Sequence, residues 1–262
     1  MNILRWLESK KREIGLSHNA LIIVAMFAML VDHIAFVLIK NGKLYGYDTA
    51  LYENAISLPE AKPWILLYTI FRMVGRISFP IYAFLIVEGF RKTSNIFKYV
   101  LRIFVLAIIS ELPFDLIVFN KCFNADCLML QNVVFTYFVG LLMLVAVKAL
   151  NSISEILSVV PAIVAIVACY LLKTDYWLEG IILIYTFYMF RHDLNVKCLI
   201  ALIVTFMMSI QRYYGFGVLS VFFIYFYDGQ KGYLDLKRFH YIFYPLHMFI
   251  LYGIIFITYW KN

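Results

Sequence analysis

The chain has 262 residues, of which 64% are hydrophobic and only 15% are charged, and its formal net charge is +7. A soluble domain carries about 25% charged residues, so this composition excludes a soluble globular protein and predicts a helical membrane protein. The basic charge suits loops on one face of a membrane, and we expect no nucleic-acid partner. No hydrophilic stretch is long enough for a second domain, so residues 1–262 are predicted to form one.

Apolar runs recur along the whole chain, and a membrane-spanning helix needs about 20 apolar residues. The sequence predicts an all-α transmembrane bundle of about nine such helices, at 20–39, 64–89, 95–118, 132–149, 153–172, 176–190, 195–210, 213–227 and 241–260. The helices at 176–190 and 195–210 are short and could form one re-entrant pair. With the N-terminus in the cytoplasm, the inner segments hold 13 Lys and Arg residues and the outer segments hold 7, which favours this orientation.

Ionisable side chains inside the predicted spans form the main functional signal, because each costs about 2.5–3.5 kcal/mol to insert. Arg72 and Arg76 are four residues apart, as are Glu111 and Asp115, so each pair shares one face of its helix. A rise of about 1.5 Å per residue lets the acids of the first and third spans and the bases of the second meet at similar depth, together with Asp32 and His33. Such charges can simply hold helices together, but a cluster of this size favours a functional site.

His33 is the strongest candidate for a catalytic residue, because imidazole transfers protons near neutral pH. Adjacent residues of a helix point about 100° apart, so Asp32 need not touch it. Glu111 or Asp115 from across the bundle could orient the ring instead. A buried histidine bonded only to backbone is the alternative interpretation.

A second, basic group is predicted at the cytoplasmic side. It comprises Glu88, Arg91, Lys92, Lys231, Lys237 and Arg238. Ordinary basic loop charge explains each of these residues, and as a group they could attract an anionic, phosphorylated donor. His247 lies roughly 9 Å from the inner edge, where it would line the donor route or stabilise the bend at Pro245. Pro80 and Pro113 predict further bends of the kind that line cavities.

The four cysteines carry little functional signal. Cys122 and Cys127 share one short outer loop and could form a disulfide in an oxidising compartment. No cysteine pair has histidines at metal-ligand spacing, so we expect no metal site.

Several segments together resemble the TraX family of membrane proteins, which is associated with acetylation of pilin at its N-terminus. The matching segments are AMFAMLVDHIAF (25–36), FRMVGRISFPIYAFLIVEGFRKTSN (71–95), YVLRIFVLAIISELPFDL (99–116), NVVFTYFVGLL (132–142) and FHYIFYPLHMFILY (239–252). The resemblance marks as motif positions Asp32, His33, Arg76, Glu88, Glu111, Asp115 and His247. It implies an acetyltransferase of the bacterial plasma (inner) membrane, with acetyl-CoA as donor and a pilin or other surface molecule as acceptor.

From the resemblance and the buried charges together we expect His33 to act as general base or as acetyl carrier, oriented by Asp32, Glu111 or Asp115. Arg76, and with it Arg72, would stabilise the oxyanion. The basic cytoplasmic group and His247 would receive acetyl-CoA. The alternative is a secondary transporter that uses the same charges as a proton relay, although no inverted repeat is visible. A purely structural subunit would leave the cluster without a reason.

Overall fold

The computed structural model describes residues 15–122, 124–151, 154, 156–234, 236 and 239–259. Within this part of the chain every regular element is a helix, and the only strand-like pairings are two isolated β-bridges. The elements are α2 (His18–Ile34), the π-helix η1 (Ala35–Lys43), α3 (Thr49–Ser57), η2 (Pro59–Ala61), α4 (Lys62–Gly75), α5 (Ser78–Lys92), α6 (Ile96–Phe119), η3 (Ala125–Met129), α7 (Val133–Asn151), η4 (Leu157–Val159), α8 (Val160–Leu172), α9 (Trp177–Met189), α10 (Leu194–Tyr213), η5 (Phe216–Val218), α11 (Leu219–Tyr225) and α12 (Phe239–Tyr259). Lys237 and Arg238 lie outside the described residues.

Five described segments are long and apolar enough to span a bilayer: His18–Lys43, Pro59–Lys92, Val133–Asn151, Leu194–Tyr213 and Phe239–Thr258. These segments make the chain a helical membrane protein. The helix α6 is also long, with 24 residues, but it carries four charged side chains. The apolar helices Leu157–Leu172, Trp177–Met189 and Phe216–Tyr225 are shorter than a full crossing requires. The prediction of nine full spans is therefore not supported, and the segment 195–210, which could have been half of a re-entrant pair, lies in a long helix.

The predicted span 64–89 is broken into α4 and α5 at Arg76 and Ile77. Pro80 lacks an amide hydrogen, and its ring would clash with the carbonyl of Arg76, four residues earlier. The α-helix therefore cannot run unbroken past this point. The backbone closes the turn with three-residue bonds instead, from Arg76 N to the Met73 oxygen (3.2 Å) and from Ile77 N to the Val74 oxygen (3.1 Å).

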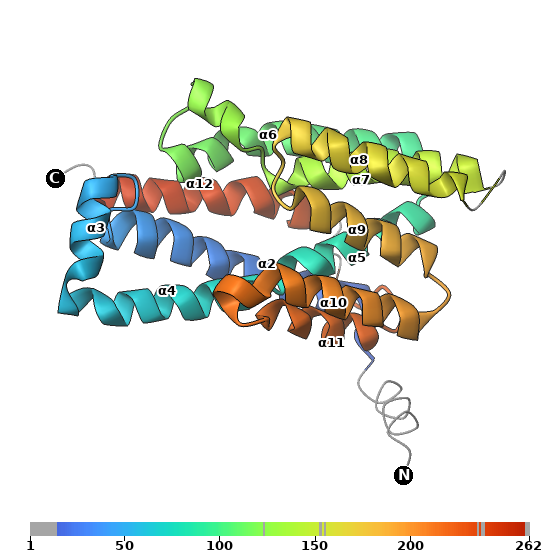
Figure 1. Ribbon diagram of the computed structural model, residues 1–262, viewed down its shortest axis with the longest axis horizontal. Coiled ribbons are helices and arrows are strands. Elements are labelled where there is room, and N and C mark those ends of the chain that lie inside the picture. The colour runs from blue at the N-terminus through green and yellow to red at the C-terminus, as the bar shows by residue number, and fades with distance from the viewer. Residues whose placement is uncertain are drawn as a thin grey trace, which may run out of the picture.

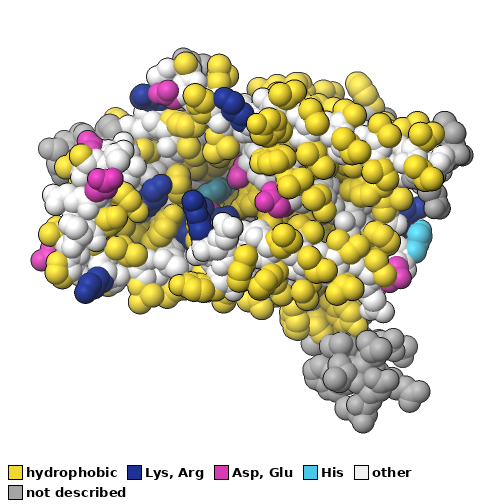
Figure 2. Space-filling view, viewed as in Figure 1, with side chains coloured by type: hydrophobic (Ala, Val, Ile, Leu, Met, Phe, Trp, Pro, Cys, Tyr) yellow, Lys and Arg dark blue, Asp and Glu magenta, His cyan; other side chains and the backbone are white. Residues whose placement is uncertain are grey.

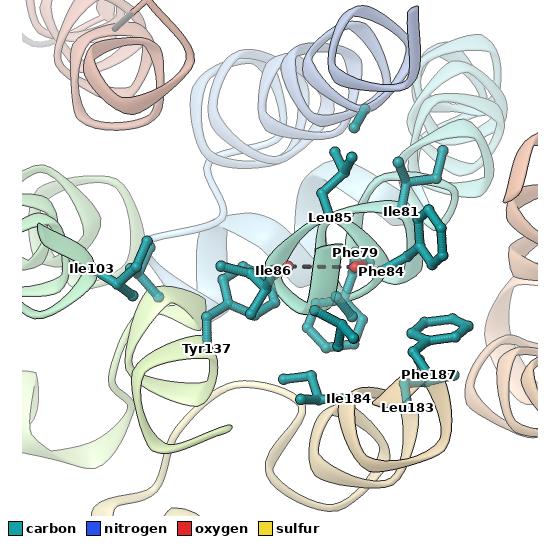
Figure 3. Packing of buried hydrophobic residues seen from close by; sticks show 14 of the residues in the cluster. Phe79, Ile81, Phe84, Leu85, Ile86, Ile103, Tyr137, Leu183, Ile184 and Phe187 are labelled. Carbon is teal, nitrogen blue, oxygen red and sulfur yellow. Dashed lines mark hydrogen bonds between the residues drawn. The ribbon is translucent and has the colours of Figure 1, made fainter. Parts of the chain in front are cut away.

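The helices run roughly along the long axis of the molecule (Figure 1). At one end α2, α4 and α12 run alongside one another and α3 lies across them, while α7 to α11 gather toward the other end. Figure 3 shows the apolar side chains of α5 meeting those of α7 and α9 in the core. Gly180 permits this close approach, because a Cβ there would lie 2.9 Å from the ring of Phe79 and 2.7 Å from Thr136 Cγ2.

Candidate active site

Asp32, Arg72 and Arg76 form a buried ion-pair cluster, which we call the arginine clamp. One carboxylate oxygen of Asp32 accepts a hydrogen bond from Arg72, and the other lies 2.9 Å from Arg76 Nη2. The three side chains are only 11–17% exposed. Gly75 makes room for the carboxylate, since a Cβ at this position would lie 2.0 Å from Asp32 Oδ1. The prediction that the acid of the first span meets the bases of the second is confirmed.

Two tyrosines that were not among the predicted site residues, Tyr176 and Tyr213, contact the arginine clamp. Arg76 Nη1 donates to the hydroxyl of Tyr176 at 2.5 Å, and the ring of Tyr176 stacks on Phe79 with centroids 4.1 Å apart. The guanidinium of Arg76 also lies over the ring of Tyr213, at 4.9 Å from its centroid. Arg72 Nε donates to the Tyr213 hydroxyl at 3.4 Å. The guanidinium groups are thus fixed by hydrogen bonds and aromatic faces as well as by Asp32.

His33 forms a hydrogen-bonded pair with His247, which brings α2 and α12 together. His33 Nδ1 lies 2.5 Å from His247 Nε2, and the rings are nearly parallel at an interplanar angle of 13°. His247 Nδ1 lies 2.6 Å from the Phe243 carbonyl oxygen, which can only accept, so this nitrogen carries a proton. In the neutral pair His247 Nε2 therefore accepts from His33 Nδ1, a tautomer assignment inferred from the bonding pattern. This tautomer leaves a lone pair on His33 Nε2, and no described residue donates a hydrogen bond to that nitrogen.

A cavity of about 890 Å³ connects the two predicted groups of charges. Asp32, His33, Arg72 and Arg76 line one part of it, and Glu88, Lys92 and Lys231 line another. Figure 2 shows a hollow on one long face of the molecule in which basic side chains and a histidine are visible. Since one cavity touches both groups, a ligand bound at the basic group can extend to His33. His247, which was predicted to line the donor route, does not line the cavity and packs behind His33 instead.

The basic group is organised around Glu88, near the end of α5. Its carboxylate contacts Arg91 at 2.6 Å and Lys92 at 3.1 Å. Lys92 also donates to the Tyr227 hydroxyl at 2.8 Å and to the Gly229 carbonyl at 3.1 Å. These bonds fix the segment before α12 against α5. Arg91 does not line the cavity, whereas His18, Arg102 and His240 do and were not predicted.

Glu111 and Asp115 do not orient His33. The Glu111 carboxylate accepts from the Asn132 side chain, and neither acid lines the cavity. The ring of His33 is oriented by His247 instead. The two histidines were predicted at different depths because a straight, complete crossing was expected for each span. Glu179, an acid in the first turn of α9, does not line the cavity either.

Asp175 is an acid of the site that the sequence did not reveal. It lies between α8 and α9, lines the cavity, and interacts electrostatically with Arg76 and Arg72. Burial is the main cause that raises the pKa of this carboxyl group, to about 6. A single acid in a short polar turn gives no signal in the sequence, because only the packing of α9 against α5 brings it to the cavity.

Cys122 and Cys127, which follow α6, are not joined by a disulfide in this structure. Among the described residues no group of three or more His, Cys, Asp or Glu side chains could hold a metal ion.

A family model described as "TraX protein" matches residues 17–255. Over 138 residues the chain is 30% identical to the "Probable fimbrial assembly protein FimC, serogroup H1" of Dichelobacter nodosus, an alignment that covers 51% of this chain and 47% of the relative. The chain thus spans about half the length of that curated relative. No solved structure matches this chain. Because the family model extends from the residue before α2 to the last turns of α12, the chain belongs to the TraX family.

Proposed function

We propose that this protein is an acyltransferase of the bacterial plasma membrane that moves an acetyl group from cytosolic acetyl-CoA to an amine or hydroxyl of an extracytoplasmic acceptor. The observation that carries the proposal is the single cavity that joins a basic group to His33, whose Nδ1 bonds His247 and whose other ring nitrogen is free. A base at one end and an anion-binding group at the other are what such a transfer requires.

In this proposal His33 Nε2 takes a proton from the acceptor as its nucleophilic atom attacks the acetyl carbonyl. The proton hydrogen-bonded between His33 Nδ1 and His247 Nε2 allows the second ring to share the resulting positive charge. The C–S bond of the thioester then breaks, and the departing thiolate takes the proton from His33. His247 is therefore a positioning residue that also stabilises the imidazolium.

The arginine clamp supplies positive potential for the oxyanion of the tetrahedral intermediate. It contains two guanidinium groups and one carboxylate, so it keeps a net positive charge. Because the clamp lies in a buried site of low dielectric and is held by Tyr176 and Tyr213, this charge acts without reorganisation.

The basic group suits the phosphates of the donor. Lys92 and Lys231 line the cavity on this side with His18 and Arg102. Lysine and arginine bind phosphate oxygens through charge-assisted hydrogen bonds. Since the chain also resembles a fimbrial assembly protein over about half its length, a pilin is one acceptor that fits, and another cell-surface molecule is the second.

The proton-relay transporter is less well supported by the same geometry. The hydrogen-bonded series from His33 ends at the Phe243 carbonyl, which cannot pass a proton onward. A relay across the membrane needs a further titratable group at that point.

The test uses the purified protein in lipid with acetyl-CoA labelled in its acetyl group. We expect release of CoA and transfer of label by the natural protein and none by His33→Ala, because the free ring nitrogen is lost. His192→Ala is the matched control, since His192 is exposed in the turn before α10. Activity in His33→Ala equal to that of the control would remove His33 from the chemistry. Proton flux without acetyl transfer would favour the transporter.

A further inference from the structure

Asp175 lies in a turn whose backbone is tightly held. Gln131 exchanges two backbone hydrogen bonds with this turn, donating to Lys173 (3.0 Å) and accepting from Asp175 (3.1 Å). The hydroxyl of Thr136 donates to the Asp175 carbonyl. Lys173 and Tyr176 flank the turn with φ values of 54° and 55°, a left-handed conformation that non-glycine residues rarely adopt. A turn fixed on both sides points its carboxylate into the cavity in a constant direction.

The carboxylate of Asp175 is not bonded to the arginine clamp. Both oxygens of Asp32 already serve Arg72 and Arg76. Asp175 forms no ion pair with any described residue, although it lines the cavity close to the clamp. A carboxylate held at a site of low dielectric without a cation is unfavourable, so a cavity-facing one suits a ligand that brings a positive charge.

Aromatic rings complete the surroundings of Asp175. Tyr137 and Tyr244 line the same cavity, and the ring of Tyr137 stacks on Phe79, which also stacks on Tyr176, the residue after Asp175. The ring of Tyr244 lies 6.3 Å from the ring of His33, centroid to centroid. Tyrosine faces attract ammonium groups, and a carboxylate beside them strengthens that attraction. A cation bound here would lie next to the catalytic histidine.

We propose that Asp175, together with Tyr137 and Tyr244, binds a primary ammonium group of the acceptor and takes one proton from it. This inference rests on the proposed function and names the residues that would hold an amine acceptor. An ammonium must lose one proton before it can attack and a second as the C–N bond forms, whereas a hydroxyl loses only one. Asp175 receives the first proton and His33 Nε2 the second. The C–S bond then breaks, His33 returns its proton to the thiolate, and Asp175 releases its proton to water through the cavity.

The binding step is tested without any acetyl transfer. The natural protein, Asp175→Asn and Glu179→Gln are placed in lipid nanodiscs at pH 8, and their melting temperatures are measured against increasing n-propylamine or 1-propanol. Glu179 is a matched control because it lies four residues further along, is half-buried, and does not line the cavity. We expect n-propylamine to raise the melting temperature of the natural protein and of Glu179→Gln. Asp175→Asn should need at least ten times more amine for the same rise.

The empty Asp175→Asn protein should melt no lower than the natural one, since the substitution removes a buried charge and keeps the shape. Should it melt lower, Asp175→Glu, which restores the charge, must recover the amine response. Equal responses of Asp175→Asn and the natural protein, or equal effects of amine and alcohol, would overturn the inference. Amine binding without transfer of acetyl from acetyl-CoA to n-propylamine would instead refute the proposed function and leave the ammonium site standing.

Discussion

The arginine clamp depends on the missing side chain at position 75, and Gly75→Ala tests this directly. A Cβ there would lie 2.0 Å from Asp32 Oδ1 and 2.4 Å from Asp32 Cβ, so Asp32 must move and its ion pairs must break. Breaking a buried ion pair costs about 3–5 kcal/mol, whereas Gly→Ala within a helix recovers about 1 kcal/mol. We therefore expect a net destabilisation of roughly 2–4 kcal/mol.

Gly253→Ala is the matched control, because a Cβ at this position in α12 meets nothing within 4 Å. It should stabilise the protein slightly through helix propensity alone. The stability of both variants is compared by thermal unfolding in the same detergent, with the exposure of cysteines to a labelling reagent as the readout. Their activity is compared by acetyl transfer in lipid. Gly75→Ala should lose both stability and activity. If the two variants prove equally stable, Asp32 is not confined as the structure describes and the reasoning about the clamp is wrong.

Three further predictions concern the site. His33→Ala and His247→Ala should each lower the rate of acetyl transfer by about 10²–10⁴-fold. The double variant should be no slower than the slower single variant, because the two rings act as one unit. Additive losses would show that the two histidines have separate roles. Burial raises the pKa of Asp175 to about 6, so n-propylamine binding should weaken as the pH falls through 6. The free energy of unfolding should decline as the pH rises from about 3.8 toward 6, because the carboxyl ionises first in the unfolded chain. Asp175→Asn should flatten both pH profiles, and unchanged profiles would exclude this group. Lys92→Gln should raise the KM for acetyl-CoA about tenfold with little change in kcat, through loss of a charge-assisted contact of about 1.5 kcal/mol. Lys121→Gln, which removes an exposed ion pair in the segment after α6, should leave KM unchanged. Equal effects of the two substitutions would argue against a donor-binding role for Lys92.

The helices and the arginine clamp could be predicted from the sequence because their signals are local. Apolar runs define the long helices, and the four-residue spacing of Arg72 and Arg76 puts both on the face that meets Asp32. Pro80 also marks the break between α4 and α5, because its effect falls on the carbonyl four residues earlier.

The histidine pair and the tyrosines could not be predicted in the same way. His247 reaches His33 only because α12 packs against α2, a contact across 214 positions of the chain. Tyr176 and Asp175 reach the cavity because α8 and α9 are short and turn within the molecule. Glu111 has a helical spacing suited to the cluster, but it faces Asn132. Hydropathy carries no information on which face of a uniformly apolar helix turns inward.

The contact between the two histidines also sets an order of events during synthesis of the protein. His33 lies in the first described helix and His247 in the last, so the ribosome must add 214 further residues before the pair can form. At about 5–20 residues per second this takes roughly 10–40 s, during which α2 is made but His33 has no partner ring. The histidine pair that we propose as the base is therefore assembled only when α12 has been made, and a nascent chain that stalls earlier carries the arginine clamp without this pair.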